Sequence, residues 1–81
     1  MSQPDLDLAL YEATALVARA LGGRGSLADI LESIYAGEPA VAWDVLRAYL
    51  RDISVDNPVY SPLRELVESA GAMMDLDLEL D

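Results

Sequence analysis

Apolar residues recur at helical spacing in four segments of the chain, and glycine or proline separates these segments from one another. The segments cover residues 5–21, 27–36, 39–53 and 61–74. Apolar side chains at positions i, i+3, i+4 and i+7 fall on one face of an α-helix, which then packs against a core. Short connections between such helices favour antiparallel neighbours. We therefore predict an all-α fold, a small four-helix bundle that continues into an acidic C-terminal tail.

The apolar face of each segment supplies the predicted core. Its members are Leu6, Leu10, Ala13, Val17 and Leu21; Leu27, Ile30, Leu31, Ile34 and Tyr35; Ala42, Val45, Leu46, Tyr49, Leu50 and Ile53; and Leu63, Leu66, Val67, Ala70 and Met74. The first segment carries further apolar residues outside this face, many of them alanine. We therefore expect the first helix to be central in the bundle or to contact another chain.

Local signals predict where the helices begin and end. Ser26 is a favourable N-cap for the second helix, and Ser61 followed by Pro62 predicts the start of the fourth. Gly71 weakens the end of the fourth helix, because glycine lowers helix stability. The connection before that helix is long for a bundle, and we expect Val55 and the residues after Pro58 to pack it onto the core.

The last seven residues alternate acid and leucine without a break, so we divide the chain into a helical domain (1–74) and an acidic tail (75–81). As a strand, the tail would place its leucines on one face and its acids on the other. A lone strand needs an edge to pair with. Three readings stay open: a solvated chain end, a strand paired within its own fold or a dimer, and a segment that becomes ordered on a partner.

The charge of the chain indicates what kind of partner it binds. The chain has 15 acids, five arginines and neither lysine nor histidine, giving a net charge of −10. Residues 53–81 hold seven of the acids and one arginine, so the charge builds toward the C-terminus. Such a field attracts basic surfaces and repels nucleic acid and anionic lipid. We expect a basic protein as partner, with no direct contact to nucleic acid or membrane.

The composition also excludes several kinds of chemistry. The chain has no cysteine, histidine or lysine, so it lacks the common general bases, a thiol nucleophile and the usual transition-metal ligands. We therefore predict no enzyme activity, no cofactor and no metal site. No apolar run is long enough for a membrane helix, and the start of the chain is acidic where a signal peptide would be basic, so we expect a cytoplasmic protein.

The stretch ALGGRGSLADIL, residues 20–31, resembles the attachment site of acyl and peptidyl carrier proteins. Those proteins are also acidic four-helix domains of about this size, and a serine followed by leucine at the start of their second helix carries phosphopantetheine. The resemblance implies that Ser26 is the modified residue. The chain departs from the family in having Gly25 where aspartate is usual, and a short connection where a long loop is usual.

A second resemblance is one of size, charge and layout. Small acidic immunity proteins that block bacterial nuclease toxins are four-helix proteins with a tyrosine- and proline-bearing loop before the last helix. The stretch PVYSP, residues 58–62, lies in a comparable place. The similarity implies a protein that covers the surface of a basic enzyme.

We predict a small acidic binding protein that inhibits a basic, nucleic-acid-handling protein by occupying its cationic surface, as DNA mimics of the anti-CRISPR or anti-restriction kind and toxin-immunity proteins do. Acids would steer association and aromatic side chains would anchor it. The predicted partner-binding residues are Glu65, Glu68, Asp75, Asp77, Glu79, Asp81, Trp43, Tyr60 and Tyr35. The alternatives are a carrier protein modified at Ser26 and a structural oligomer, such as a homodimer, built on the first helix.

Overall fold

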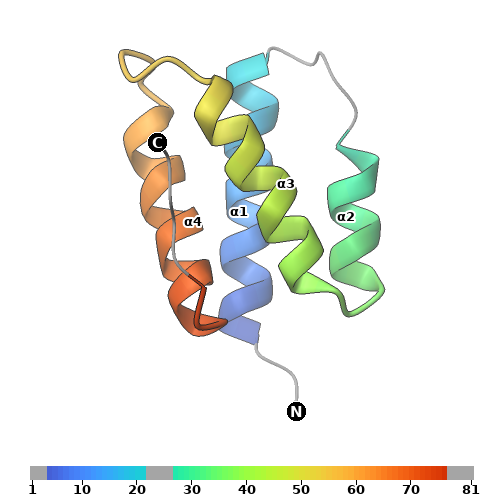
Figure 1. The fold of residues 1–81 in the computed structure, drawn as a ribbon. Coiled ribbons are helices and arrows are strands. Elements are labelled where there is room, and N and C mark those ends of the chain that lie inside the picture. The colour runs from blue at the N-terminus through green and yellow to red at the C-terminus, as the bar shows by residue number, and fades with distance from the viewer. Residues whose placement is uncertain (1–3, 22–26, 77–81) are drawn as a thin grey trace.

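The computed structural model describes residues 4–21 and 27–76, and these residues form four helices. They are α1 (Pro4–Leu21), α2 (Ala28–Tyr35), α3 (Pro39–Asp52) and α4 (Tyr60–Met73) (Figure 1). The described residues contain no strand, so the predicted all-α bundle is confirmed. None of these helices is long and apolar enough to cross a membrane.

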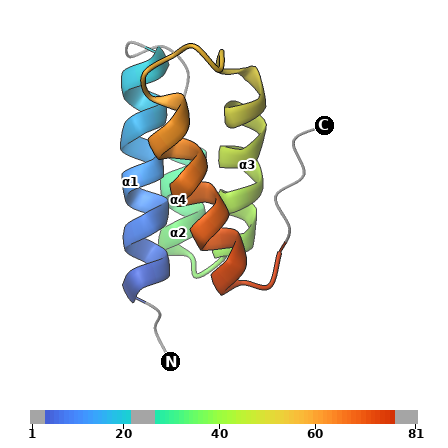
Figure 2. The same cartoon turned by 90° about the vertical axis from the view of Figure 1, so that its left-hand side faces the viewer.

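The helices alternate in direction, and α1 and α3 lie between the other two (Figures 1 and 2). α1 contacts all three other helices, and α3 also contacts α2 and α4. Within the described residues α2 and α4 do not contact each other. The cross-section is therefore a flattened rhombus with α1 and α3 on its short diagonal, and the alanine-rich α1 has the central place that its sequence predicts.

One apolar core joins the four helices. Its buried side chains are Leu6, Ala9, Leu10, Ala13, Val17, Ile30, Ile34, Ala42, Trp43, Leu46, Leu50, Leu63, Val67 and Ala70. Thr14 is buried among them, and its hydroxyl donates to the carbonyl of Leu10 at 2.7 Å, which satisfies the polar group without leaving the helix. The periodic positions of the sequence thus account for most of the core.

Several predicted core positions lie nearer the surface than expected: Tyr35 and Val55 are exposed, and Leu21, Leu27, Leu31, Val45, Tyr49, Ile53, Leu66 and Met74 are half-buried. Tyr35 is 80% exposed at the last residue of α2. Val55 is 71% exposed in the connection before α4, whereas Val59 and Tyr60 are half-buried and pack against the core as predicted. Leu66 is half-buried, because it lies at the edge of the contact between α4 and α1.

The starts of α2 and α4 differ from the prediction. α2 begins at Ala28 with Leu27 in the N-cap position, and the predicted cap, Ser26, lies outside the described residues. α4 begins one residue before the predicted cap, because the side chain of Asn57 accepts a 2.9 Å hydrogen bond from the backbone N–H of Val59 and turns the chain early. Pro62 then lies in the first turn, where its missing N–H costs no hydrogen bond.

Candidate partner-binding surface

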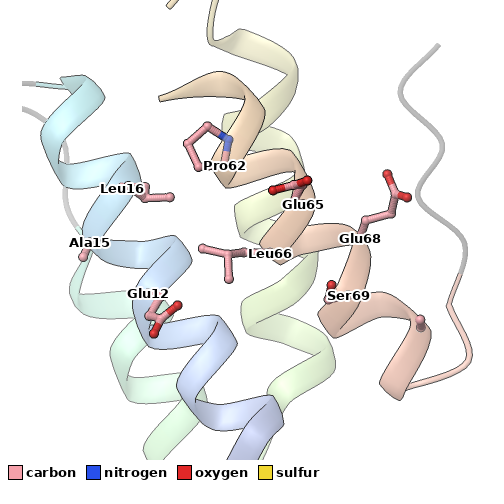
Figure 3. Close-up of a pocket in the computed structure, with 9 residues that line it drawn as sticks. Glu12, Ala15, Leu16, Pro62, Glu65, Leu66, Glu68 and Ser69 are labelled. Atoms are coloured by element: carbon pink, nitrogen blue, oxygen red, sulfur yellow. The ribbon is translucent and has the colours of Figure 1, made fainter. Parts of the chain in front are cut away.

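A shallow groove of about 980 Å³ runs between α1 and α4 on the surface of the bundle (Figure 3). Its lining residues are Glu12, Ala15 and Leu16 from α1, and Pro62, Glu65, Leu66, Glu68, Ser69 and Ala72 from α4. Leu16 and Leu66 point into the space between the two helices, with Glu12 and Glu65 beside them, whereas Ala15 lies on the edge of α1 away from α4 and Glu68 on the side of α4 away from α1 (Figure 3). The groove is therefore an apolar strip bordered by carboxylates.

Helical spacing places these side chains together. On α4 the buried stripe contains Leu63, Val67 and Ala70, and each lining residue lies one or two positions away from a member of that stripe. On α1 the lining residues flank the buried Ala13 and Val17 in the same way. The two flanks meet because the helices pack side by side and run in opposite directions (Figure 2).

The charged residues that line the groove are all negative. Glu12, Glu65 and Glu68 are all exposed, and no arginine is among the described lining residues. The nearest compensation is an ion pair in which Arg64 Nε lies 3.7 Å from Glu68 Oε2, and both side chains are more than half exposed. An exposed pair of this kind contributes about 0–1 kcal/mol. The rim therefore keeps its negative character.

The structure brings together only part of the predicted site. Glu65 and Glu68 lie on the groove, while Asp75 lies beyond the end of α4 and Tyr60 is half-buried at the start of that helix. Tyr35 is exposed on α2, which does not contact α4 in the described residues. The other predicted tail acids, Asp77, Glu79 and Asp81, lie outside the described residues.

Trp43 is not available as an anchor, which corrects the prediction. Its side chain is 4% exposed, and its indole N–H donates to the carbonyl of Val67 at 2.7 Å. The Arg47 guanidinium lies over the ring, 5.4 Å from its centre. The sequence contained a signal for this position, because Trp43 stands three and seven residues before the core leucines 46 and 50.

The first residue of the tail closes α4 and does not begin a strand. Asp75 has a φ of 60°, in the left-handed region. The backbone N–H of Leu76 donates to the carbonyl of Gly71 at 2.7 Å, and that of Asp75 donates to the carbonyl of Ala72 at 3.2 Å. These two bonds form a Schellman motif. The predicted alternation from residue 77 onward lies outside the described residues.

An aromatic pair lies between α1 and α2. The rings of Tyr11 and Tyr35 are 6.1 Å apart between centres and meet edge to face at 62°. Partial burial, a hydrogen bond with Tyr35 and the nearby charge of Asp7 raise the pKa of the Tyr11 hydroxyl. The pair joins α1 to α2 and leaves the Tyr35 ring open to solvent.

One end of the bundle, at the bottom of Figure 1, gathers acids from distant parts of the sequence. We name it the acidic end, and its members are Asp5, Asp7, Glu38 and Asp75. The described arginines lie in the opposite half, on the last turns of α1 and α3, the second half of α3 and the start of α4. Three of these four acids precede residue 39, so the acidic end is not the C-terminal concentration of acids seen along the sequence. Asp29, Asp52 and Asp56 lie toward the other end of the helices.

Sequence reasoning selected only Glu65 and Glu68 among the groove residues, and it missed Glu12, Ala15, Leu16, Pro62, Leu66, Ser69 and Ala72. The only signal for Glu12 and Ala15 is a position beside the apolar stripe of the first helix, which solvated positions also have. The chain matches no family model, no curated protein and no solved structure. The carrier reading stays a prediction, because Ser26 and the residues before it, back to Gly22, lie outside the described residues.

Proposed function

We propose that this chain is a small acidic binding protein that inhibits a basic, nucleic-acid-handling protein by occupying its cationic surface. The observation that carries the proposal is the groove between α1 and α4, whose largely apolar lining also contains Glu12, Glu65 and Glu68. A surface with both features attracts a basic partner at long range and retains it by burying apolar area.

The mechanism has two steps. The net charge of −10, which builds toward the C-terminus, accelerates encounter with a cationic groove and orients the inhibitor. Apolar contact then slows dissociation, and the exposed Tyr35 and the groove floor offer that contact. A DNA mimic directed at a defence nuclease and an immunity protein directed at a toxin nuclease would both work in this way.

The test begins with capture of partners from a lysate of the source cell, followed by elution with rising salt. Two baits are compared, the full chain and a chain that ends at Leu76. The shorter bait must keep Leu76, because its backbone N–H caps α4 through the carbonyl of Gly71. A truncation at Met74 would remove this cap and confound loss of charge with loss of structure.

The decisive readout is competition. A captured protein is given a fluorescently labelled nucleic acid, and the full chain is added at several salt concentrations. We expect displacement of the nucleic acid, weaker displacement at high salt, and slower association when Asp75, Asp77 and Glu79 are neutralised together. Salt-independent binding, or a captured partner that keeps its nucleic acid, contradicts the proposal.

A further inference from the structure

We infer that the groove between α1 and α4 receives a single basic amphipathic helix of the partner protein. The inference rests on the proposed function and names the part of the partner that the inhibitor recognises. It follows from the shape of the groove floor and the position of the carboxylates. It also follows from the negative charge of the two other candidate occupants, a second copy of the chain and the chain's own tail.

The floor has the form that a helix needs. Ala15 on α1, and Ser69 and Ala72 on α4, are small and exposed, so a helical backbone can approach both borders of the groove closely. Leu16 and Leu66 are half-buried and offer apolar contact along the same line. From Pro62 to Ala72 the groove follows α4 for about 15 Å, roughly three turns of an α-helix. A short helix with apolar residues at i, i+3 or i+4, and i+7 matches this length.

The rim specifies the charge of the occupant on both flanks. Glu12 stands on the α1 side, and Glu65 and Glu68 stand on the α4 side (Figure 3). Glu12 and Glu65 make no ion pair with any described residue, and Glu68 is only loosely paired with Arg64. A helix with arginine or lysine on each side of an apolar stripe would satisfy both walls while its stripe covers the floor.

A second copy of this chain is a poor occupant. Face-to-face pairing of two such grooves would bring the glutamates of both rims together, and like charges across an interface oppose association. The chain's own acidic tail is disfavoured for the same reason. The negative rim therefore selects a partner of opposite charge.

The test uses a labelled peptide of about 14 residues, roughly four helical turns, with leucines at helical spacing and arginines on both flanks. A scrambled peptide of the same composition lacks the apolar stripe. Binding is measured by fluorescence anisotropy with the full chain and two double variants. Glu12→Gln with Glu65→Gln alters the groove, and Glu32→Gln with Glu38→Gln makes the same charge change in a separate hollow on α2 and the turn after it.

A bulkier, uncharged side chain in the groove tests the assignment without changing the charge of the protein. Ala15→Gln adds bulk to the groove, and Ala48→Gln makes the same change at an exposed position of α3. Both positions are exposed and helical, so circular dichroism should show folded protein in each case. We expect Ala15→Gln to weaken binding of the patterned peptide and Ala48→Gln to leave it unchanged.

We expect the patterned peptide to bind more tightly than the scrambled one, and the Glu12/Glu65 variant to weaken it roughly threefold to tenfold. The Glu32/Glu38 variant should change binding less than about twofold. Equal losses in both double variants, or equal binding of both peptides, would show a general charge effect and overturn the inference. A dimer in sedimentation that the Ala15→Gln change disrupts would assign the groove to a second copy and overturn it as well.

The two proposals fail separately. If the peptide binds in the groove but the chain does not displace nucleic acid from a captured partner, the proposed function fails and the groove assignment stands. If the chain displaces nucleic acid and the Glu12/Glu65 variant does so equally well, the groove assignment fails and the function stands.

Discussion

Trp43, Gly71 and Leu76 lie in close contact at the edge of the core, and Trp43 and Leu76 leave no free space for a side chain at position 71. A Cβ at position 71 would lie 3.0 Å from two atoms of the Trp43 indole and 3.0 Å from the carbonyl oxygen of Leu76. The indole is also fixed by its hydrogen bond to Val67. Glycine is therefore retained inside a helix, where it would otherwise be unfavourable, because no other residue leaves space for the ring.

Gly71→Ala should consequently lower the free energy of unfolding, by about 1 kcal/mol. Alanine in a helix interior gains about 1 kcal/mol over glycine, but overpacking a fixed core typically costs about 1–3 kcal/mol. Urea unfolding followed by Trp43 fluorescence measures the change. Ser69→Ala, at an exposed position of the same helix, serves as the control and should be neutral or slightly stabilising. A gain of stability in Gly71→Ala would contradict the assigned packing.

The raised pKa of Tyr11 predicts how the stability of the fold depends on pH. Because its folded pKa is raised, the neutral hydroxyl contributes stability that is present below the unfolded pKa of about 10 and is lost as pH rises through the folded pKa. In Tyr35→Phe, Tyr11 loses its hydrogen-bond partner, so its pKa should move back toward the ordinary value. An absorbance titration of tyrosinate, with Tyr60→Phe as control, measures this. An unchanged titration of the remaining tyrosines in Tyr35→Phe would refute the coupling.

At the scale of elements, the acidic end contains both N-termini and C-termini of helices, whose partial charges have opposite signs. α1 and α3 begin there, and acids such as Asp5 interact favourably with the partial positive charge of a helix N-terminus. α4 ends there, and Asp75 lies against a terminus of partial negative charge in a left-handed conformation. Acids of equal charge at the same end of the bundle therefore have opposite effects on stability.

A matched pair of changes tests this difference. Asp75→Asn should raise the free energy of unfolding and Asp5→Asn should lower it, each by about 0.3–1 kcal/mol, although both remove one negative charge. Asp75→Gly should stabilise further, because glycine adopts the left-handed conformation without strain. Thermal unfolding at low salt measures all three. Changes of the same sign in Asp75→Asn and Asp5→Asn would show that net charge, and not the helix termini, sets the effect.

At the scale of the whole molecule, the same charge has opposite consequences for folding and for binding. A net charge of −10 on 81 residues repels itself, and salt screens this repulsion over about 10 Å at 0.1 M. Sodium chloride should therefore raise the melting temperature while it weakens the proposed partner binding. The Glu32→Gln/Glu38→Gln variant, with less charge, should gain less from salt. A melting temperature that falls with added chloride would contradict this account.

How far the sequence predicted the candidate site depended on the kind of information each residue carried. Glu65 and Glu68 could be selected because acids cluster toward the C-terminus, and the structure places both at the groove. Glu12 could not be selected, because its relevance comes from α1 packing against α4. Trp43, at the border of the apolar face of its helix, was selected as an anchor although its spacing matched the core, since an aromatic residue at such a border fits either place.

The periodicity of apolar residues by itself determined four helices and most of the core, because each helix must bury one face and the spacing of 3.6 residues marks that face. Composition determined the sign and size of the charge. Tertiary packing alone decided which helix flanks meet, and so created the groove from residues that are far apart in the sequence. It also decided that the acids of α1 and the last turn of α4 share one end, because antiparallel packing places the start of one helix beside the end of the other.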